Sequence, residues 1–149
     1  MEHTLHKCNA AVIACIDWRI RQDGTFLKFL DERYDGKYDL IVVAGAGKDL
    51  LDPDFRTHML KQLELSIKLH QPDRIAITAH MDCGAEGGSA AFENRKAEHT
   101  HLRERLRHAR EAIGARFPQF PTDEYIIELA ENPAGQWIST PRAEIKNPA

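Results

Sequence analysis

Short apolar segments alternate along this chain with longer stretches of helical periodicity, and this alternation restricts the fold more than any other feature. The segments 11–16, 40–44 and 74–79 are of strand length and consist mostly of β-branched and small apolar residues. Runs that are apolar at nearly every position are typical of strands covered on both faces. The alternation with helical stretches therefore predicts an α/β protein with a parallel sheet.

Three helices are expected from the stretches between and after these segments. Apolar residues recur at helical spacing over 26–34, which predicts a short helix. A second helix should begin at the pair Asp52-Pro53, because Asp52 can accept the first amide hydrogen bonds and proline suits the first turn, and it should end before Pro72. The stretch 93–117 has a narrow apolar stripe on a charged background, which indicates a solvated helix face with i,i+4 ion pairs.

A fourth strand is expected at 125–129, close to the C-terminus. We therefore expect a three-layer α/β fold with a central, mostly parallel sheet of about four strands flanked by helices. The 149 residues and the 42% hydrophobic content suit one packed domain, 1–149. Residues 1–9 are expected to form a short N-terminal arm, and residues 131–149, rich in proline, an irregular C-terminal arm.

Composition excludes several classes of function. Lys and Arg number 20 against 23 Asp and Glu, a net charge of -3, which does not favour nucleic acid or a membrane surface as partner. The apolar runs are far shorter than the roughly 20 residues of a membrane span, and the N-terminus has no apolar signal segment, so we expect a cytoplasmic protein. Three cysteines are an odd number and do not suggest a disulfide framework.

Two of these cysteines stand where strands should end. Cys15 closes the first predicted strand, whereas His80 and Cys83 follow the third. The carboxyl ends of parallel strands meet at one edge of a sheet, so these side chains can converge. Two sulfurs and one nitrogen suit tetrahedral zinc. On the alternative interpretation, Cys15 is a small core residue, His80 a hydrogen-bonded loop residue and Cys83 incidental.

The chain resembles the β-class carbonic anhydrases in the segments that end three predicted strands. They are Cys15-x-Asp17-x-Arg19, His80-x-x-Cys83-Gly84 and the pair Ala44-Gly45. The resemblance implies a parallel sheet flanked by helices and an obligate dimer or higher homo-oligomer. It also implies one zinc ion per chain, held by Cys15, His80 and Cys83.

The resemblance further implies a dyad of Asp17 and Arg19. In one state Asp17 pairs with Arg19 and water fills the fourth zinc position, whereas in the other Asp17 is itself a zinc ligand and closes the site. Zinc with two thiolates and a neutral imidazole has no net charge and acidifies water less than zinc on three histidines. A carboxylate that orients the nucleophile would help, and Arg19 would keep it off the metal. An ordinary ion pair at a strand end would share this geometry.

The expected function is therefore zinc-dependent reversible hydration of carbon dioxide to bicarbonate by attack of a zinc-bound hydroxide. Where the family has an Arg-Asn pair before Ala-Gly, this chain has Val42-Val43. The resemblance therefore does not decide between carbon dioxide and related small substrates. Carbonyl sulfide or carbon disulfide hydrolysis is one alternative. A non-catalytic zinc-binding module closed by Asp17 is another. A third is a redox-responsive protein in which Cys15 and Cys83 form a disulfide when metal is absent.

Overall fold

The computed structural model describes residues 5–144, and residues 1–4 and 145–149 of the two expected arms lie outside this range. The described part contains one sheet, with strand order β2-β1-β3-β4-β5. Its strands are β1 (Ala10–Ala14), β2 (Tyr38–Val42), β3 (Arg74–His80), β4 (Thr122–Glu131) and β5 (Trp137–Ala143). The first four are parallel, and β5 is antiparallel to β4.

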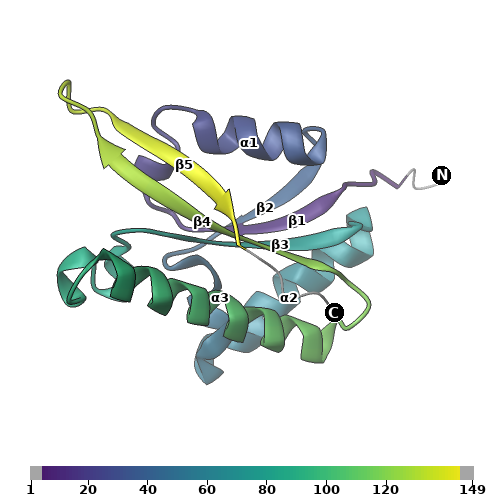
Figure 1. Ribbon diagram of the computed structural model, residues 1–149. Coiled ribbons are helices and arrows are strands. Elements are labelled where there is room, and N and C mark those ends of the chain that lie inside the picture. The colour runs from purple at the N-terminus through teal and green to yellow at the C-terminus, as the bar shows by residue number, and fades with distance from the viewer. Residues whose placement is uncertain (1–4, 145–149) are drawn as a thin grey trace.

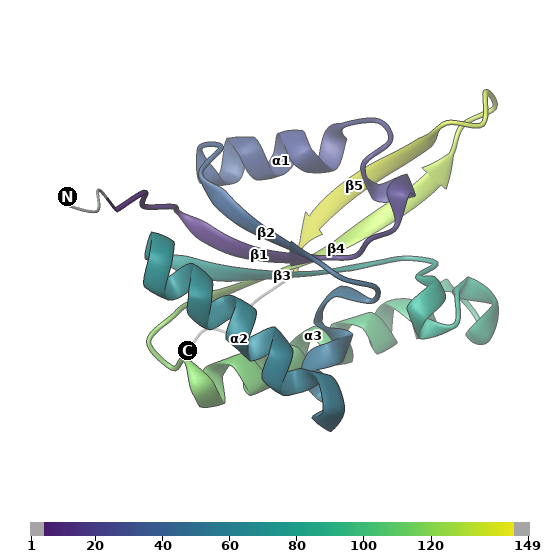
Figure 2. The same cartoon turned by 180° about the vertical axis from the view of Figure 1, so that it is seen from behind.

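Helices cover both faces of the sheet. They are α1 (Thr25–Tyr34), α2 (Pro53–His70) and α3 (Arg95–Arg116), and short 3₁₀ helices lie at 18–20, 46–51, 84–86 and 89–91. Figures 1 and 2 show α1 on one face and α2 with α3 on the other. The predicted three-layer, mostly parallel α/β fold is thus confirmed. Within residues 5–144, no helix combines the length and the apolarity that crossing a membrane requires.

The centre of the sheet is β1, which is buried at all five positions. It lies between β2 and β3, with Ile13 in register with Ile41 on one side and Ile77 on the other. Helices on both faces leave such a strand no solvent-exposed side. This buried position explains why the sequence is apolar throughout 10–14, whereas Ile16, at the end of the predicted run, lies beyond the strand and is 54% exposed.

The second helix begins as the sequence predicts. The Asp52 side chain accepts a hydrogen bond from the Asp54 amide at 2.9 Å, and Pro53 occupies the first turn. Met59 and Leu63 are buried against the sheet, whereas Phe55, from the same apolar stripe, is 53% exposed. The buried face of α2 therefore begins one turn later than the stripe suggests.

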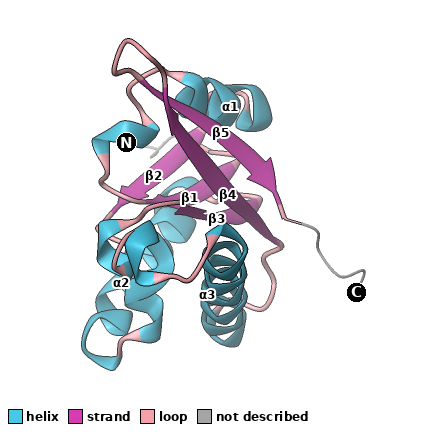
Figure 3. Cartoon of the chain, turned by 60° about the vertical axis from the view of Figure 1, so that its left-hand side comes forward, coloured by secondary structure: helices cyan, strands magenta, loops and turns pink. Residues whose placement is uncertain are grey.

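The expectation of an irregular arm at 131–149 is wrong for its described part. There β4 continues to Glu131, and Trp137–Ala143 pairs with it as a fifth strand. The turn between them uses Gly135 at φ +79°, a backbone conformation that glycine adopts easily. Pro141 is tolerated because β5 is an edge strand. Figure 3 shows β5 at the edge of the sheet, joined to β4 by a hairpin. In this sequence, glycine therefore marks the hairpin turn and proline the sheet edge.

Candidate metal centre

The structure brings Cys15, His80 and Cys83 together at the carboxyl ends of β1 and β3. Their possible ligand atoms all lie within 4.8 Å of one another, and the three residues are 5%, 1% and 4% exposed. Cys15 comes directly after β1, and His80 is the last residue of the neighbouring β3. The parallel pairing of these two strands is what joins residues far apart in the sequence.

One nitrogen of His80 has no partner. Its Nδ1 lies 2.8 Å from the Met81 carbonyl oxygen and must donate the hydrogen bond, because a carbonyl only accepts. In the neutral imidazole Nε2 then carries the lone pair, and this atom is buried without a hydrogen-bond partner. An unpartnered buried polar atom is costly unless a ligand satisfies it. A nitrogen lone pair beside two sulfurs is a donor set that fits a zinc ion.

The two thiols share this environment unequally. The hydrogen bond from Cys83 lowers the pKa of Cys15 against the opposing effect of burial, and the Gly45 amide lowers it further. The pKa of Cys83 is raised by the neighbouring Cys15 and by burial. One thiolate is therefore favoured even before a metal ion binds, and thiolates are the form in which cysteine is a ligand.

Gly45 lets the backbone approach the cluster. Its amide donates a hydrogen bond to the Cys15 sulfur at 3.3 Å. It has φ +76°, and a Cβ at this position would lie 3.1 Å from the Ala85 Cβ. Both the positive φ and the close approach therefore favour glycine at this position.

Asp17 and Arg19 lie beside the cluster as a paired carboxylate and guanidinium. Asp17 Oδ2 is 3.8 Å from His80 Nε2, close to the roughly 3.4 Å that separates two light ligand atoms on one tetrahedral zinc. Arg19 holds this carboxylate, with Nη2 at 2.7 Å from Oδ2 and Nε at 3.1 Å from both oxygens. The hydrogen bonds lower the pKa of Asp17, which is ionised at neutral pH. The carboxylate is thus near the donor set but is bound to Arg19.

Two further partners of Arg19 were missed by the sequence analysis. Its Nη1 donates to Asp82 Oδ2 at 2.8 Å, and its guanidinium lies 4.8 Å from the centre of the Trp137 ring. The sequence could have indicated Asp82, since it lies between two predicted ligands, His80 and Cys83. No sequence pattern indicates the contact between Trp137 and Arg19, because it depends on the hairpin of β4 and β5.

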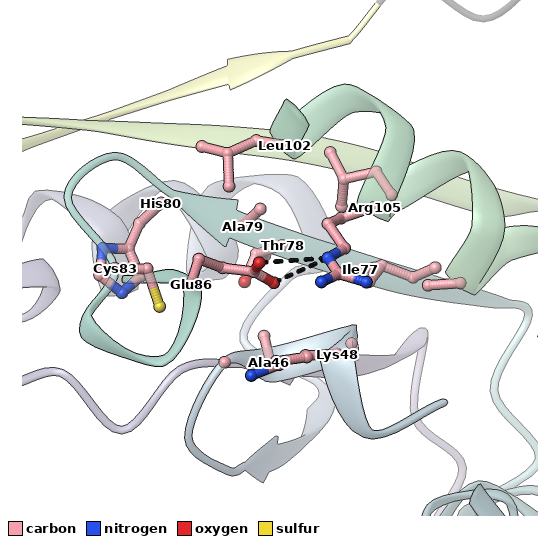
Figure 4. Close-up of a pocket in the computed structure, with 14 residues that line it drawn as sticks. Ala46, Lys48, Ile77, Thr78, Ala79, His80, Cys83, Glu86, Leu102 and Arg105 are labelled. Atoms are coloured by element: carbon pink, nitrogen blue, oxygen red, sulfur yellow. Dashed lines mark hydrogen bonds and ion pairs between the residues drawn. The ribbon is translucent and has the colours of Figure 1, made fainter. Parts of the chain in front are cut away.

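A small cavity adjoins His80 and Cys83 on the side of α3 (Figure 4). Its volume is about 20 Å³, enough for one water molecule. Across the cavity the carboxylate of Glu86, 7% exposed, pairs with Arg105 at 3.1 Å and with His101 at 2.7 Å. The remaining walls are mostly apolar except for Lys48, whose ammonium group donates to the Ala85 carbonyl oxygen at 2.6 Å.

Comparisons with known proteins support this fold and show the family. A family model described as "Putative carbonic anhydrase" matches residues 5–120, which is most of the 149 residues and includes both cysteine motifs. No curated protein matches the chain. Among solved structures, β-carbonic anhydrase isoform I of the protozoan Trichomonas vaginalis matches with a TM-score of 0.55 and 15% identity, over 93% of this chain and 87% of that one. At this identity the match shows a shared fold. Because the family match spans most of the sequence, the chain belongs to this carbonic anhydrase family.

Proposed function

We propose that the protein is a zinc-dependent carbonic anhydrase that hydrates carbon dioxide reversibly to bicarbonate. The observation that carries the proposal is the unpartnered, buried Nε2 of His80, which faces the thiols of Cys15 and Cys83. A metal ion on these three ligands would satisfy the nitrogen. Family membership and the neighbouring pair of Asp17 and Arg19 support a catalytic role over a purely structural one.

Zinc, when bound by these residues, supplies a Lewis acid that lowers the pKa of water at the site. Two thiolates and a neutral imidazole cancel its charge, so the surrounding residues must assist. Asp17 is ionised and therefore only accepts hydrogen bonds, which allows its carboxylate to orient the attacking oxygen toward carbon dioxide. Arg19 holds both carboxylate oxygens in place for this task.

The test begins with metal analysis of the purified protein, followed by carbon dioxide hydration assays at pH 7 and pH 9. We expect about one zinc ion per chain, and faster hydration at the higher pH. Asp17→Asn should keep the zinc and lose about 10²- to 10⁴-fold in rate, as expected for a positioned acid–base group. Asp54, an exposed residue in the first turn of α2, provides the control. Asp54→Asn should have the zinc content and hydration rate of the wild type.

Arg19→Ala should also keep the zinc but abolish hydration, because the freed Asp17 carboxylate can occupy the open metal position. A wild-type protein that holds zinc but hydrates no carbon dioxide at either pH contradicts the proposal. Assays with carbonyl sulfide and carbon disulfide then separate a related hydrolase from a non-catalytic zinc-binding module.

We further propose that the protein acts as a homodimer or higher homo-oligomer in the cytoplasm. Ile16 and Trp18, on either side of Asp17, are 54% and 58% exposed, and Ile138 of β5 is 36% exposed. Apolar side chains exposed beside a candidate site favour cover by another chain. Sedimentation at micromolar concentration checks the assembly, and a monomer would contradict it.

A further inference from the structure

Arg19 is clamped between two carboxylates that come from different strand ends. Asp17 follows β1, and Asp82 lies two residues beyond the end of β3. Arg19 Nη1 donates to Asp82 Oδ2 at 2.8 Å, and Nη2 donates to the Asp82 carbonyl oxygen at 2.9 Å. The Trp137 ring lies against the same guanidinium. The loop after β3 therefore fixes Arg19 independently of Asp17.

The two carboxylates do not compete for the same hydrogens. Asp17 takes hydrogen bonds from Nε and Nη2, whereas the Asp82 carboxylate takes one from Nη1. A guanidinium offers five N–H donors in a rigid planar fork, so it can hold both partners at once. Asp82 acts as the second anchor of Arg19, and Asp17 is held at the other edge of the fork.

Asp82 is itself fixed by buried groups. Its backbone has φ +57°, and its amide donates to Glu98 Oε1 at 2.6 Å. Glu98 lies on α3 and is 3% exposed. The second Asp82 oxygen, Oδ1, accepts from the Ser89 amide at 2.8 Å, and the Ser89 hydroxyl donates to Glu98 Oε2 at 2.8 Å. This network leaves Asp82 little freedom to follow Arg19.

We propose that Asp82 is a positioning residue that anchors Arg19 and thereby controls whether Asp17 stays off the metal position. Asp17 Oδ2 is 3.8 Å from His80 Nε2, so a small movement would bring the carboxylate into the donor set. Without the Asp82 side chain, Arg19 keeps the Asp82 carbonyl oxygen and the Trp137 ring as neighbours but loses its charged partner on this side, so it can follow Asp17 more easily. The inference deepens the proposed function and rests on one part of it, the binding of a metal ion by Cys15, His80 and Cys83.

Two variants of Asp82 test the role. Asp82→Gly removes the carboxylate and keeps the backbone, because glycine adopts φ +57° without strain. Asp82→Asn keeps the shape and the tolerance of positive φ but removes the charge. Asp35 provides the matched control, since it is exposed, has φ +55° and lies at the end of α1. Asp35→Gly and Asp35→Asn carry the same backbone change elsewhere in the molecule.

The measurement uses cobalt-substituted protein, whose visible absorption reports the ligands of the metal. Thiocyanate is titrated at pH 8, since a small anion binds only where a coordination position is open. The Asp82 side chain is 43% exposed, so the loss of its charged hydrogen bond should be moderate. We expect Asp82→Gly to bind thiocyanate about 3- to 10-fold more weakly than the wild type, with Asp82→Asn between them. Metal content and thermal midpoint are recorded for each variant.

Several outcomes overturn the inference. One is that both Asp82 variants keep the wild-type spectrum and thiocyanate affinity. Another is that the Asp35 variants weaken anion binding equally. If Asp82→Gly loses its metal, Asp82→Asn decides, and an unchanged affinity in that variant refutes the role. A wild-type protein that binds no thiocyanate also refutes it, because Asp17 is then already on the metal.

Failure of the proposed function would look different. In that case the wild type hydrates no carbon dioxide, yet the cobalt spectrum and anion affinity still respond to Asp82→Gly. The positioning role of Asp82 then stands, and the catalytic role of the site falls.

Discussion

The two ends of the parallel strands both bury polar side chains, but only one of them has the composition of a ligand site. The carboxyl ends of β1 and β3 bring together Cys15, His80 and Cys83. At the amino end of β4, Tyr125 and Asp123 meet Tyr34 of α1. All six residues are at most 5% exposed.

At the amino end, the two tyrosine hydroxyls and the Asp123 carboxylate satisfy one another. The Tyr34 hydroxyl donates to Asp123 Oδ2 at 2.8 Å, so its remaining contact, at 2.8 Å from the Tyr125 hydroxyl, must use Tyr125 as the donor. Arg74 Nε lies 3.2 Å from the same carboxylate oxygen. The Tyr34 hydroxyl thus both donates and accepts, which indicates a structural role.

At the carboxyl end, by contrast, one buried polar atom is left without a hydrogen bond. This atom is His80 Nε2, and the groups around it are thiols and a carboxylate, which can bind metal ions. The comparison shows that burial of polar groups does not by itself mark a functional site. An unpartnered lone pair beside groups able to share a metal ion is the more specific sign.

The largest expected effect is the loss of metal from the carboxyl end. His80→Ala removes the only nitrogen of the donor set and should weaken zinc affinity by more than about 100-fold, since even partners outside the ligand set are worth 10- to 100-fold. Titration with a competing chelator measures the change. Cys15→Ala and Cys83→Ala should behave alike.

Cys8→Ala is the control for these variants. Cys8 is also buried, at 6% exposure, but its thiol lies near the Ala10 carbonyl oxygen, at the start of β1. It should keep the wild-type affinity for zinc. Equal loss of metal from the Cys8 variant would mean that the site has been assigned to the wrong residues.

The second expected effect lies at the amino end and concerns stability alone. Tyr34→Phe leaves the buried Asp123 and Tyr125 without one hydrogen bond each, which should lower the free energy of unfolding by about 1–3 kcal/mol. Urea denaturation measures it. Tyr38→Phe removes an exposed hydrogen bond to Asp31 and should cost less. A change in zinc affinity in either variant would break the distinction between the two ends.

Alkaline pH should lower the stability that the amino-end cluster contributes through Tyr34. Burial raises the pKa of Tyr34, and its hydrogen bonds with Tyr125 and Asp123 raise it further. Above the ordinary tyrosine pKa of about 10, the unfolded chain releases this proton while the folded protein keeps it. Stability contributed by the neutral hydroxyl is therefore complete below pH 10 and declines as the pH rises further.

Denaturation at pH 9 and pH 11 checks this sign. The wild type should lose stability over this interval, and Tyr34→Phe should lose less, by up to about 1.4 kcal/mol per pH unit. The prediction is refuted if the two proteins decline in parallel. Tyr38, whose pKa burial raises to about 12, contributes to the decline that both share.

These two ends also show what the sequence can reveal. The fold was predictable because β1 is buried on both faces and its sequence is accordingly apolar at every position. Cys15 and His80 were predicted to converge because each ends a strand, and neighbouring parallel strands end at the same edge. The amino-end cluster was not predicted, because Tyr34 and Asp123 meet only through the packing of α1 on the sheet.

The fifth strand and the partners of Arg19 were missed for related reasons. Pro141 argues against a strand in the interior of a sheet but is compatible with an edge, and only the sheet order shows which applies. Trp137 reaches Arg19 through this strand. Asp82 was visible beside Cys83, but its contact with Arg19 depends on the fold of the loop after β3.

The smallest expected effect lies on α3, away from both clusters. The sequence predicts i,i+4 ion pairs along this helix, and Arg107 with Glu111 is one, at 2.8 Å, with side chains 50% and 57% exposed. Other arginines of the helix instead reach acidic groups elsewhere, as Arg105 does with Glu86. The prediction therefore describes only part of the charged face.

Arg107→Ala should change the free energy of unfolding by no more than about 0.5 kcal/mol, because solvent screens an exposed helical pair and ordering two long side chains costs entropy. Arg105→Ala should cost more, since it leaves the carboxylate of Glu86, 7% exposed, with His101 as its remaining close partner. Urea denaturation at low and high salt compares them. Salt should erase the Arg107 effect and leave most of the Arg105 effect, because screening acts mainly on exposed charges. Equal responses would mean that burial of the acidic partner does not decide which charges of α3 matter.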